Sequence, residues 1–407
     1  MPDQPRILPT EFDPEDEYRP EPEPEPLPPI WLDGSKRIGI HTSIAGSVKN
    51  ALESARRLGC NALQIFSASP RMWQGGSARI SEVDGQSFRA RREELALGPL
   101  VIHANYLINL AAQEPMLRTR SIQAFQDEVV RAVALGADFL VVHPGARGEA
   151  SPAQAIATIV ESVKQASKRV TMERLRILIE NTAGMGTAVG SRLEEIGHIL
   201  YGLRGVPAGA CLDTAHLFAA GYDIKSEKGF EATLDQVDAA VGLENVPVFH
   251  VNDSKIELGG KVDRHEHIGR GKIGAEAFSR LLQHPKLGSA PPNGVVGRAF
   301  IAETPIDDPG DDRRNVATLW ELAGLKKQAP GAEKGFSMMT ATMKKNIAAH
   351  QKKRKREEKK EGKKKDNAEA QRTRRSAERP RSVKKAGVNR TRVKKKLAKK
   401  KAKKKRG

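Results

Sequence analysis

The alternation of short apolar runs with helical stretches is the feature that most constrains the fold of this chain. It extends from residue 35 to about residue 327 and is typical of repeated βα units on a parallel sheet. Eight candidate strands are found, at residues 37–41, 61–66, 100–105, 139–143, 176–180, 209–213, 247–252 and 299–303. Amphipathic stretches predict intervening helices, among them 47–58, 119–135, 153–170 and 275–282. Eight units favour an α/β fold with a single, closed (β/α)₈ barrel of the TIM type.

The two ends of the chain differ in composition from the part between them. Residues 1–34 are rich in proline and contain ten Asp or Glu against two Lys or Arg, a net charge of −8. Residues 331–407 contain 32 Lys or Arg against seven Asp or Glu, a net charge of +25. Because the whole chain has a charge of +19, about +2 is left for residues 35–330. We therefore expect a disordered acidic arm, a barrel domain over 35–330 and a disordered basic tail.

Cysteine usage and hydropathy limit the compartment in which the protein works. The two cysteines, Cys60 and Cys211, each lie in an apolar run, which predicts buried, reduced thiols and no disulfide. No stretch approaches the roughly 18 apolar residues of a membrane span. We expect a monomer in the cytoplasm, associated with the nucleoid and not with a membrane, or a nuclear protein if the source is eukaryotic.

In six consecutive candidate strands, the apolar run ends on a residue type that binds metals. These residues are His103, His143, Glu180, Asp213, His250 and Glu303. A single histidine or glutamate at a strand end is usually a hydrogen-bonded structural residue, but six in succession are hard to explain in that way. Because the carboxyl ends of parallel barrel strands meet at one mouth, the sequence predicts that these side chains share one site.

Two further pairs extend the set to five imidazoles and four carboxylates. His216 follows Asp213 by three residues, and Asp263 and His265 are two residues apart, a spacing that directs both to one side of an extended loop. Imidazole with carboxylate and without thiolate suits zinc, manganese or iron. Nine ligands exceed the needs of one tetrahedral ion but suit three ions with a bridging carboxylate. Clustered divalent ions are typical of enzymes that hydrolyse phosphodiesters.

Several long motifs in residues 36–305 resemble the endonuclease IV family, the zinc-dependent apurinic/apyrimidinic endonucleases. They are IGIHTSIAGS at 38–47, SPRMW at 69–73, HANYLINLA at 103–111, LIENTAGMG at 178–186, CLDTAHLFAAGYD at 211–223, HVNDSK at 250–255 and DRHEHIGRG at 263–271. The resemblance implies a barrel with three zinc ions at its mouth, and all nine family ligands have a counterpart here. Manganese or iron could replace part of the zinc.

The resemblance also implies a role for each site residue. His103, His143 and Glu180 would hold one zinc ion, and Glu180 would bridge to a second, held also by Asp213, His250 and Glu303. His216, Asp263 and His265 would hold the third. Glu180 is the residue on which catalysis is expected to depend. The implied reaction is hydrolysis of duplex DNA on the 5′ side of an abasic site, giving a 3′-hydroxyl and a 5′-deoxyribose phosphate, together with cleaning of 3′ ends. Arg71 and Tyr106 are the candidates for DNA contact.

Other histidines and other functions stand beside this interpretation. His267 is expected to be an exposed loop residue and His41 a supporting residue, neither of them a ligand. The basic tail is expected to contact DNA phosphates by counterion release. One alternative is a metal-dependent sugar isomerase or epimerase, which would use only Glu180, Asp213, His250 and Glu303. Another is a non-catalytic nucleoid-binding protein in which the tail alone is active.

Overall fold

An eight-stranded parallel sheet forms the centre of the molecule in the computed structural model, which describes residues 36–73, 80–288 and 298–324. The strands are β1 (Arg37–Ile40), β2 (Leu63–Phe66), β3 (Leu100–His103), β4 (Phe139–Val142), β5 (Arg176–Glu180), β6 (Ala208–Asp213), β7 (Val248–His250) and β10 (Ala299–Ala302). Their order is β1-β10-β7-β6-β5-β4-β3-β2. A single parallel bridge between His41 and Gln64 joins the two ends of this order. The strands therefore form a nearly closed barrel, as predicted.

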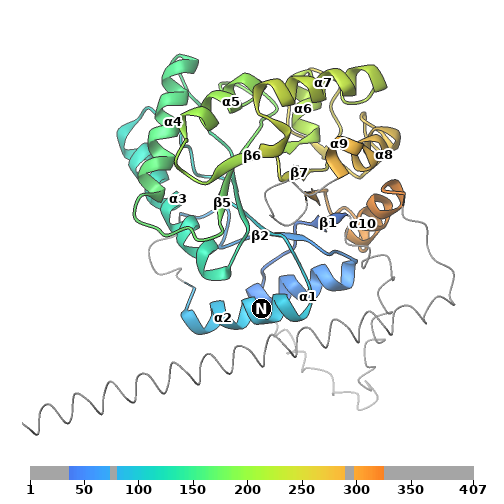
Figure 1. The fold of residues 1–407 in the computed structure, drawn as a ribbon, viewed down its shortest axis with the longest axis horizontal. Helices are drawn as coiled ribbons and strands as arrows, with labels where there is room; N and C mark the ends of the chain where they lie inside the picture. Colours follow the sequence, from blue (N-terminus) through green and yellow to red (C-terminus); the bar gives the residue numbers. More distant parts are fainter. Residues whose placement is uncertain (1–35, 74–79, 289–297, 325–407) are drawn as a thin grey trace, which may run out of the picture. The chain divides into compact units, whose positions relative to one another are not determined.

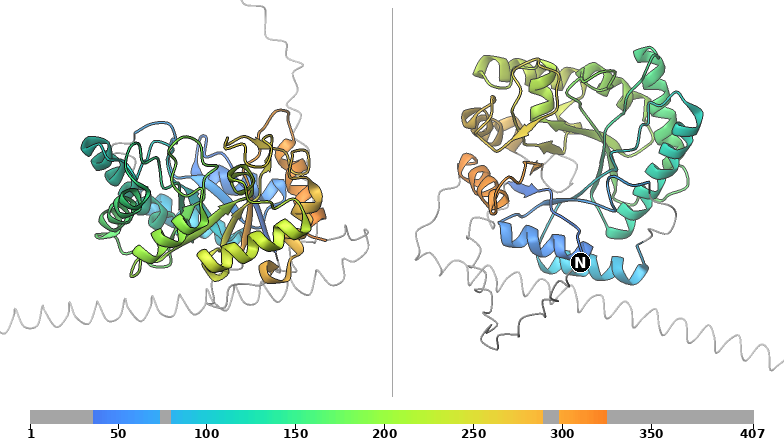
Figure 2. Two further views of the ribbon diagram at one scale, coloured as in Figure 1. Left: turned by 90° about the horizontal axis from the view of Figure 1, so that it is seen from above. Right: turned by 180° about the vertical axis from the view of Figure 1, so that it is seen from behind.

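The helices lie outside the ring of strands and follow one another around it in chain order (Figures 1 and 2). They are α1 (Val48–Leu58), α2 (Glu82–Glu94), α3 (Pro115–Leu135), α4 (Pro152–Ser167), α5 (Leu193–Gly202), α6 (Thr214–Ala220), α7 (Glu227–Ala240), α8 (Ala275–Gln283), α9 (Pro285–Gly288) and α10 (Asp311–Leu322), with a 3₁₀ turn at Leu243–Asn245. Local signals set several of their starts. Ser151, for example, forms a capping box with Gln154 at the start of α4, where Pro152 occupies the first turn.

Side chains inside the barrel form an apolar layer below its mouth. The layer consists of Ala62, Val101, Phe139, Val141, Leu178, Cys211, Val248, Ala299 and Ile301, all completely buried. Because side chains alternate between the two faces of a strand, the residue two positions after an interior one also points inward. Space in this layer is limited at Gly39, where a Cβ would lie 2.4 Å from the carbonyl oxygen of Ala62.

A short antiparallel hairpin follows β7 and was not predicted. It pairs β8 (Asp253–Ser254) with β9 (His265–Glu266). Asp253 is completely buried, and its carboxylate accepts hydrogen bonds from the backbone N–H groups of Ser254 at 2.8 Å, Gly271 at 2.9 Å and Ile273 at 3.0 Å. The hairpin and the loop after it are thus fixed to one carboxylate.

The cysteines lie within the described residues, whereas the two ends of the chain do not. Cys60 and Cys211 are both free and buried, as predicted. The acidic arm, the basic tail and the last residues assigned to the barrel domain lie outside the described residues. In the described part of the chain, no helix combines the length and the hydropathy needed to cross a membrane.

Candidate metal centre

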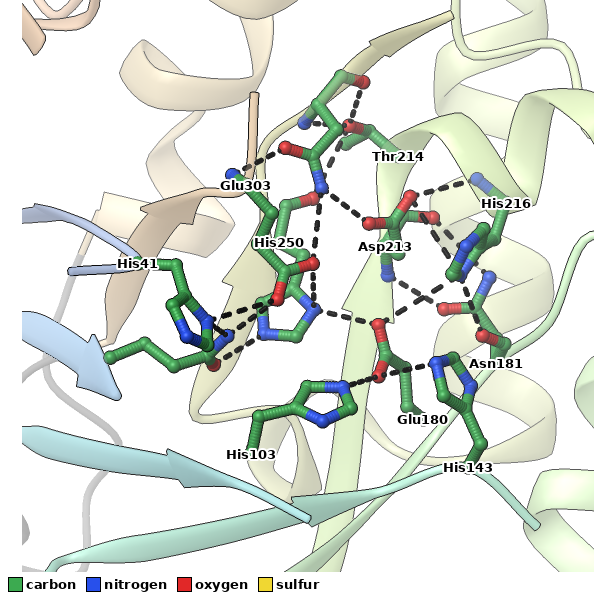
Figure 3. Close-up of polar contacts among 12 residues, drawn as sticks. His41, His103, His143, Glu180, Asn181, Asp213, Thr214, His216, His250 and Glu303 are labelled. Atoms are coloured by element: carbon green, nitrogen blue, oxygen red, sulfur yellow. Dashed lines mark hydrogen bonds and ion pairs between the residues drawn. The ribbon is translucent and has the colours of Figure 1, made fainter. Parts of the chain in front are cut away.

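The six predicted strand-end residues meet at the carboxyl end of the barrel, together with residues from the loops that follow (Figure 3). The inward alternation accounts for this, since Val101 precedes His103 by two positions, Leu178 precedes Glu180, and Cys211 precedes Asp213. Above them lies a cleft of about 250 Å³ whose walls include His103, Tyr106, His143, His216, Asp263, His265 and Glu303.

Glu180 lies at the centre of the cluster and is completely buried. Its Oε2 atom is 3.1 Å from His103 Nε2 and 3.4 Å from His143 Nε2. Its Oε1 atom is 2.6 Å from His250 Nδ1, which is also 3.2 Å from Glu303 Oε2. Potential ligand atoms of His103, His143 and Glu180 form one compact group, and those of Glu180, Asp213, His250 and Glu303 form a second. Glu180 belongs to both groups, which is the position predicted for a bridging carboxylate.

A third group contains Asp213, His216 and His265. Asp263 adjoins it, because its two carboxylate oxygens are each 3.2 Å from an imidazole, Oδ2 from His216 Nε2 and Oδ1 from His265 Nε2. Its side chain is about half exposed, so this group opens toward the cleft. Asp213 was assigned to the second group alone, but in the structure it lies between the second and the third.

The imidazoles are held so that one ring nitrogen of each faces a carboxylate. His103 Nδ1 donates to the carbonyl oxygen of Ala104 at 2.8 Å, and His216 Nδ1 donates to that of Asn181 at 2.9 Å. His265 Nδ1 donates to the carbonyl oxygen of Glu303 at 3.1 Å. A carbonyl oxygen can only accept, so in each neutral ring the Nε2 atom carries the free lone pair. Metal-binding histidines are commonly oriented in this way.

Buried ring nitrogens without a hydrogen-bond partner further support a metal site. Among the described residues, these include Nδ1 of His143 and Nε2 of His216 and His265. The Nε2 atoms of His216 and His265 lie against the carboxylate of Asp263. Five imidazoles and four carboxylates, without a coordinating thiolate in the predicted set, form a donor set that fits zinc and also manganese or iron.

Electrostatic coupling in the cluster favours the ionised form of Glu180 and the protonated forms of His216 and His265 when no metal is bound. Burial raises the pKa of Glu180, but His143, His250 and His103 outweigh it and hold that pKa well below its ordinary value. Burial likewise disfavours the charged form of His216, but Asp213 and Asp263 raise its pKa to about 10. For His265, burial is outweighed by Asp213 and Asp263, which raise its pKa to about 9. A cation that replaced these protons would meet several carboxylates.

Three amide side chains support the cluster and were missed in the sequence. Asn181 Oδ1 accepts from the backbone N–H of Asp213 at 2.6 Å. Asn252 Nδ2 donates to Asp213 Oδ2 at 2.6 Å, and its Oδ1 accepts from the Glu303 N–H at 2.6 Å. Gln64 is the third and contacts His250 and Glu303. Asn181 directly follows the inward Glu180, and Asn252 lies two positions after the inward His250. This closeness in the sequence is a signal that would have identified both as neighbours of the site.

The expectation for His267 was wrong in one respect. The residue is not exposed but buried, at 7% exposure. Asn315 Nδ2 donates to His267 Nδ1 at 3.1 Å, so Nε2 carries the ring proton and faces Asp307 Oδ2 at 3.2 Å. His267 thus ties the β9 hairpin to α10, and its Nε2 faces Asp307 and not the cluster around Glu180. His41 lies beside Glu303, with its Nδ1 3.8 Å from Oε1.

Of the two candidate DNA-contact residues, Tyr106 lines the cleft and Arg71 lies in a neighbouring loop. Tyr106 follows β3, is 58% exposed and packs edge-on against Phe66, with ring centroids 5.3 Å apart. Arg71 lies in the loop after β2 and is exposed. The two loops are joined, because the Tyr106 N–H donates to the carbonyl oxygen of Pro70 at 3.2 Å and Asn105 Nδ2 donates to that of Met72 at 2.8 Å.

Comparison with known proteins first establishes the class of barrel. The family described as a xylose isomerase-like TIM barrel matches residues 52–314. A D-tagatose 3-epimerase-like protein of known structure is 18% identical with a TM-score of 0.53 over 71% of this chain and 97% of its own, a likeness of fold. The protein is therefore a TIM barrel of the xylose isomerase-like class.

More similar relatives identify the family. A probable endonuclease 4 of Solibacter usitatus is 48% identical over 298 residues, which are 72% of this chain and 99% of the relative. A probable endonuclease 4 of Chloroflexus aurantiacus is 38% identical over 70% of this chain and 98% of its own length. The crystal structure of endonuclease IV from Thermus thermophilus is 39% identical with a TM-score of 0.62, covering 71% of this chain and all of the other. The chain belongs to the endonuclease IV family and is an endonuclease.

Proposed function

We propose that this protein is a DNA repair endonuclease that hydrolyses the phosphodiester on the 5′ side of abasic sites, leaving a 3′-hydroxyl and a 5′-deoxyribose phosphate. Its relatives are named endonuclease 4 and endonuclease IV. The observation that carries the proposal is the cluster around Glu180, where nine residues suited to metal binding lie together and six of them line one cleft. Cleaning of damaged 3′ ends would use the same centre, because it is also phosphodiester hydrolysis.

The residues present suit three zinc ions. His103, His143 and Glu180 would hold the first, and Glu180, Asp213, His250 and Glu303 would hold the second. His216, Asp263 and His265 would hold the third, with Asp213 nearby. When bound, clustered divalent ions supply positive charge at the attacking and leaving oxygens of a phosphodiester.

The chain's own residues would orient the ions and the substrate. Glu180 and Asp213, both completely buried, would keep fixed negative charge beneath the reacting phosphate, and the backbone carbonyls would keep the imidazoles in one orientation. Tyr106 and Arg71 would contact the DNA beside the lesion. A nucleotide without a base can be turned out of the duplex at little cost, which favours abasic sites as substrate.

A sugar isomerase would use only the second group. The third group, with His216 and His265 around Asp213, would have no role in such an enzyme. The similarity to epimerase-like structures concerns the fold and does not carry an activity.

The basic tail, residues 331–407, would hold the enzyme near DNA. Its charge of +25 is suited to phosphate contacts that release counterions and weaken with salt. We place recognition of the lesion in the barrel and not in the tail.

The test is incision of a duplex that contains one abasic site, with an undamaged duplex of the same sequence as control. We expect a single cut 5′ to the lesion that carries a 3′-hydroxyl, and loss of this cut after treatment with a strong chelator and its return with zinc. Equal cutting of both duplexes, or full activity in chelator, would contradict the proposal.

A further inference from the structure

Gln64 is a polar residue at the inner face of the barrel, where its neighbours along the strand are apolar. It lies on β2 between the inward positions of Ala62 and Phe66 and is completely buried. On the adjacent β3, the residue paired with Gln64 is the apolar Val101, and the candidate ligand His103 is paired with Phe66, two positions nearer the mouth. An amide is a weak ligand for zinc, so this position calls for another explanation.

Three contacts within the site use both the oxygen and the nitrogen of the Gln64 amide. Its Oε1 atom faces His250 Nε2 at 2.8 Å. Its Nε2 atom donates to Glu303 Oε1 at 2.5 Å and lies 3.0 Å from His41 Nδ1. The orientation of the amide follows from chemistry, because the opposite orientation would place its oxygen against the carboxylate of Glu303.

These contacts determine which atoms of His250 and Glu303 face the rest of the site. Since Gln64 Oε1 accepts from His250 Nε2, the lone pair of the neutral ring is on Nδ1. That atom is 2.6 Å from Glu180 Oε1 and 3.2 Å from Glu303 Oε2. On Glu303, Oε1 is occupied by Gln64, which leaves Oε2 toward His250 and Asn252.

His250 differs from the other imidazoles in the nature of its acceptor. His103, His216 and His265 donate to backbone carbonyl oxygens, which no substitution removes. His250 donates to a side chain, so one substitution can release it.

We propose that Gln64 is a positioning residue that aligns His250 and Glu303 for one metal ion, the ion of the group formed by Glu180, Asp213, His250 and Glu303. This inference rests on the proposed function, in which these residues hold a metal. Loss of such an orienting contact typically lowers metal affinity about 10- to 100-fold. The other two groups keep their own backbone acceptors and retain their ions.

The test compares Gln64→Met with Gln86→Met in the full-length, zinc-loaded protein. Met has nearly the length of Gln but makes none of its hydrogen bonds. Gln86 is an exposed residue of α2 that bonds only Glu82 among the described residues, so it controls for the same chemical change. Each variant is dialysed against chelators of increasing strength, and zinc per chain is measured by atomic emission.

We expect Gln64→Met to release one ion per chain at a free zinc concentration about 10- to 100-fold higher than Gln86→Met does, and to release the remaining ions together with the control. Release of all ions at the same concentrations as the control would overturn the inference. So would an equal shift for every ion, which would indicate a general structural role.

A second measurement separates positioning from folding. In a His250→Ala background, Gln64→Met should change zinc release clearly less than it does in the wild-type background, because one of the two residues it orients is gone. An undiminished effect there would also overturn the inference. Wild-type protein that binds no zinc even with the weakest chelator would instead refute the proposed function. A failure of the proposed function can thus be told apart from a failure of the inference about Gln64.

Discussion

At the scale of single residues, the site depends on how each imidazole is anchored more than on which residues are present. Four of the five histidines donate one ring N–H to an oxygen, three to backbone carbonyls and His250 to Gln64. The remaining nitrogens face Glu180, Asp213 or Asp263. The raised pKa values of His216 and His265 favour a proton on their Nε2 atoms when no metal is present, which leads to a prediction about pH.

Metal-free protein should lose stability as the pH rises through about 9 to 10. The pKa values of His216 and His265 are raised to about 10 and about 9 by neighbouring carboxylates, against burial. Their stabilising contribution is complete below the ordinary histidine pKa of about 6.5 and disappears above the raised values. Asp263 has a lowered pKa and acts in the opposite sense. Its stabilising contribution is complete at pH values above its ordinary pKa and is lost as the pH falls.

The measurement is the melting temperature of chelated and zinc-loaded protein between about pH 7 and about pH 10.5, a range that spans the two raised pKa values. The difference between the two forms should grow with pH, because the loaded site holds no protons there and other groups titrate alike in both. A difference that is constant or shrinks would contradict this account.

Replacement of Tyr106 by Ala should lower kcat/KM for abasic incision roughly tenfold or more, since one aromatic contact with nucleic acid contributes about 1 to 3 kcal/mol. Its ring is 58% exposed, so stability should change little. Tyr201→Ala is the matched control, because Tyr201 is 65% exposed and lies on α5 against Arg204. Equal effects of the two changes would exclude a DNA contact by Tyr106.

At the scale of elements, the third metal group depends on the hairpin β8–β9, which carries His265 and is fixed by Asp253. Asp253→Ala would leave several buried N–H groups without their acceptor, among them those of Gly271 and Ile273. We expect a loss of about 3 kcal/mol in the free energy of unfolding of the metal-free protein, measured in urea. Asp235→Ala, at an exposed position of α7, should cost under about 0.5 kcal/mol. Comparable stabilities of the two variants would contradict the role of Asp253.

The strands were predictable from sequence because each is a short apolar run between helical stretches, as is typical of a buried parallel sheet. All eight were confirmed, each within two residues of the expected ends. The alternation of side chains along the strands brought His103, Glu180 and Asp213 to one face. The two-residue strands β8 and β9 are too short to show any periodicity, and they could not be predicted.

What the sequence could not reveal were contacts between distant segments. The burial of His267 depends on Asn315 of α10, 48 residues away. The role of Gln64 depends on His250, which is 186 residues away. The bridge between β1 and β2 and the pairings of β1 with β10 and of β10 with β7 bring Gln64 and His250 together.

At the scale of the whole molecule, the barrel region is nearly neutral and the tail is strongly basic. We therefore expect the barrel to recognise the lesion and the tail to contact DNA phosphates. A chain truncated after residue 330 should bind undamaged duplex more weakly at low salt and with a smaller dependence on salt, because it lacks the +25 charge of residues 331–407. Fluorescence anisotropy at two salt concentrations measures this. Incision of abasic DNA at saturating substrate should be unchanged. Equal affinity at low salt would contradict a role for the tail in DNA binding.

We propose that a metal cluster around Glu180 incises abasic DNA, and kcat/KM of Glu180→Gln on a duplex with one abasic site tests this. The change keeps the shape of the side chain and removes the charge shared by two groups of ligands. We predict a loss of at least roughly 100-fold, with the fold retained by circular dichroism. Activity close to that of the wild type would contradict the account.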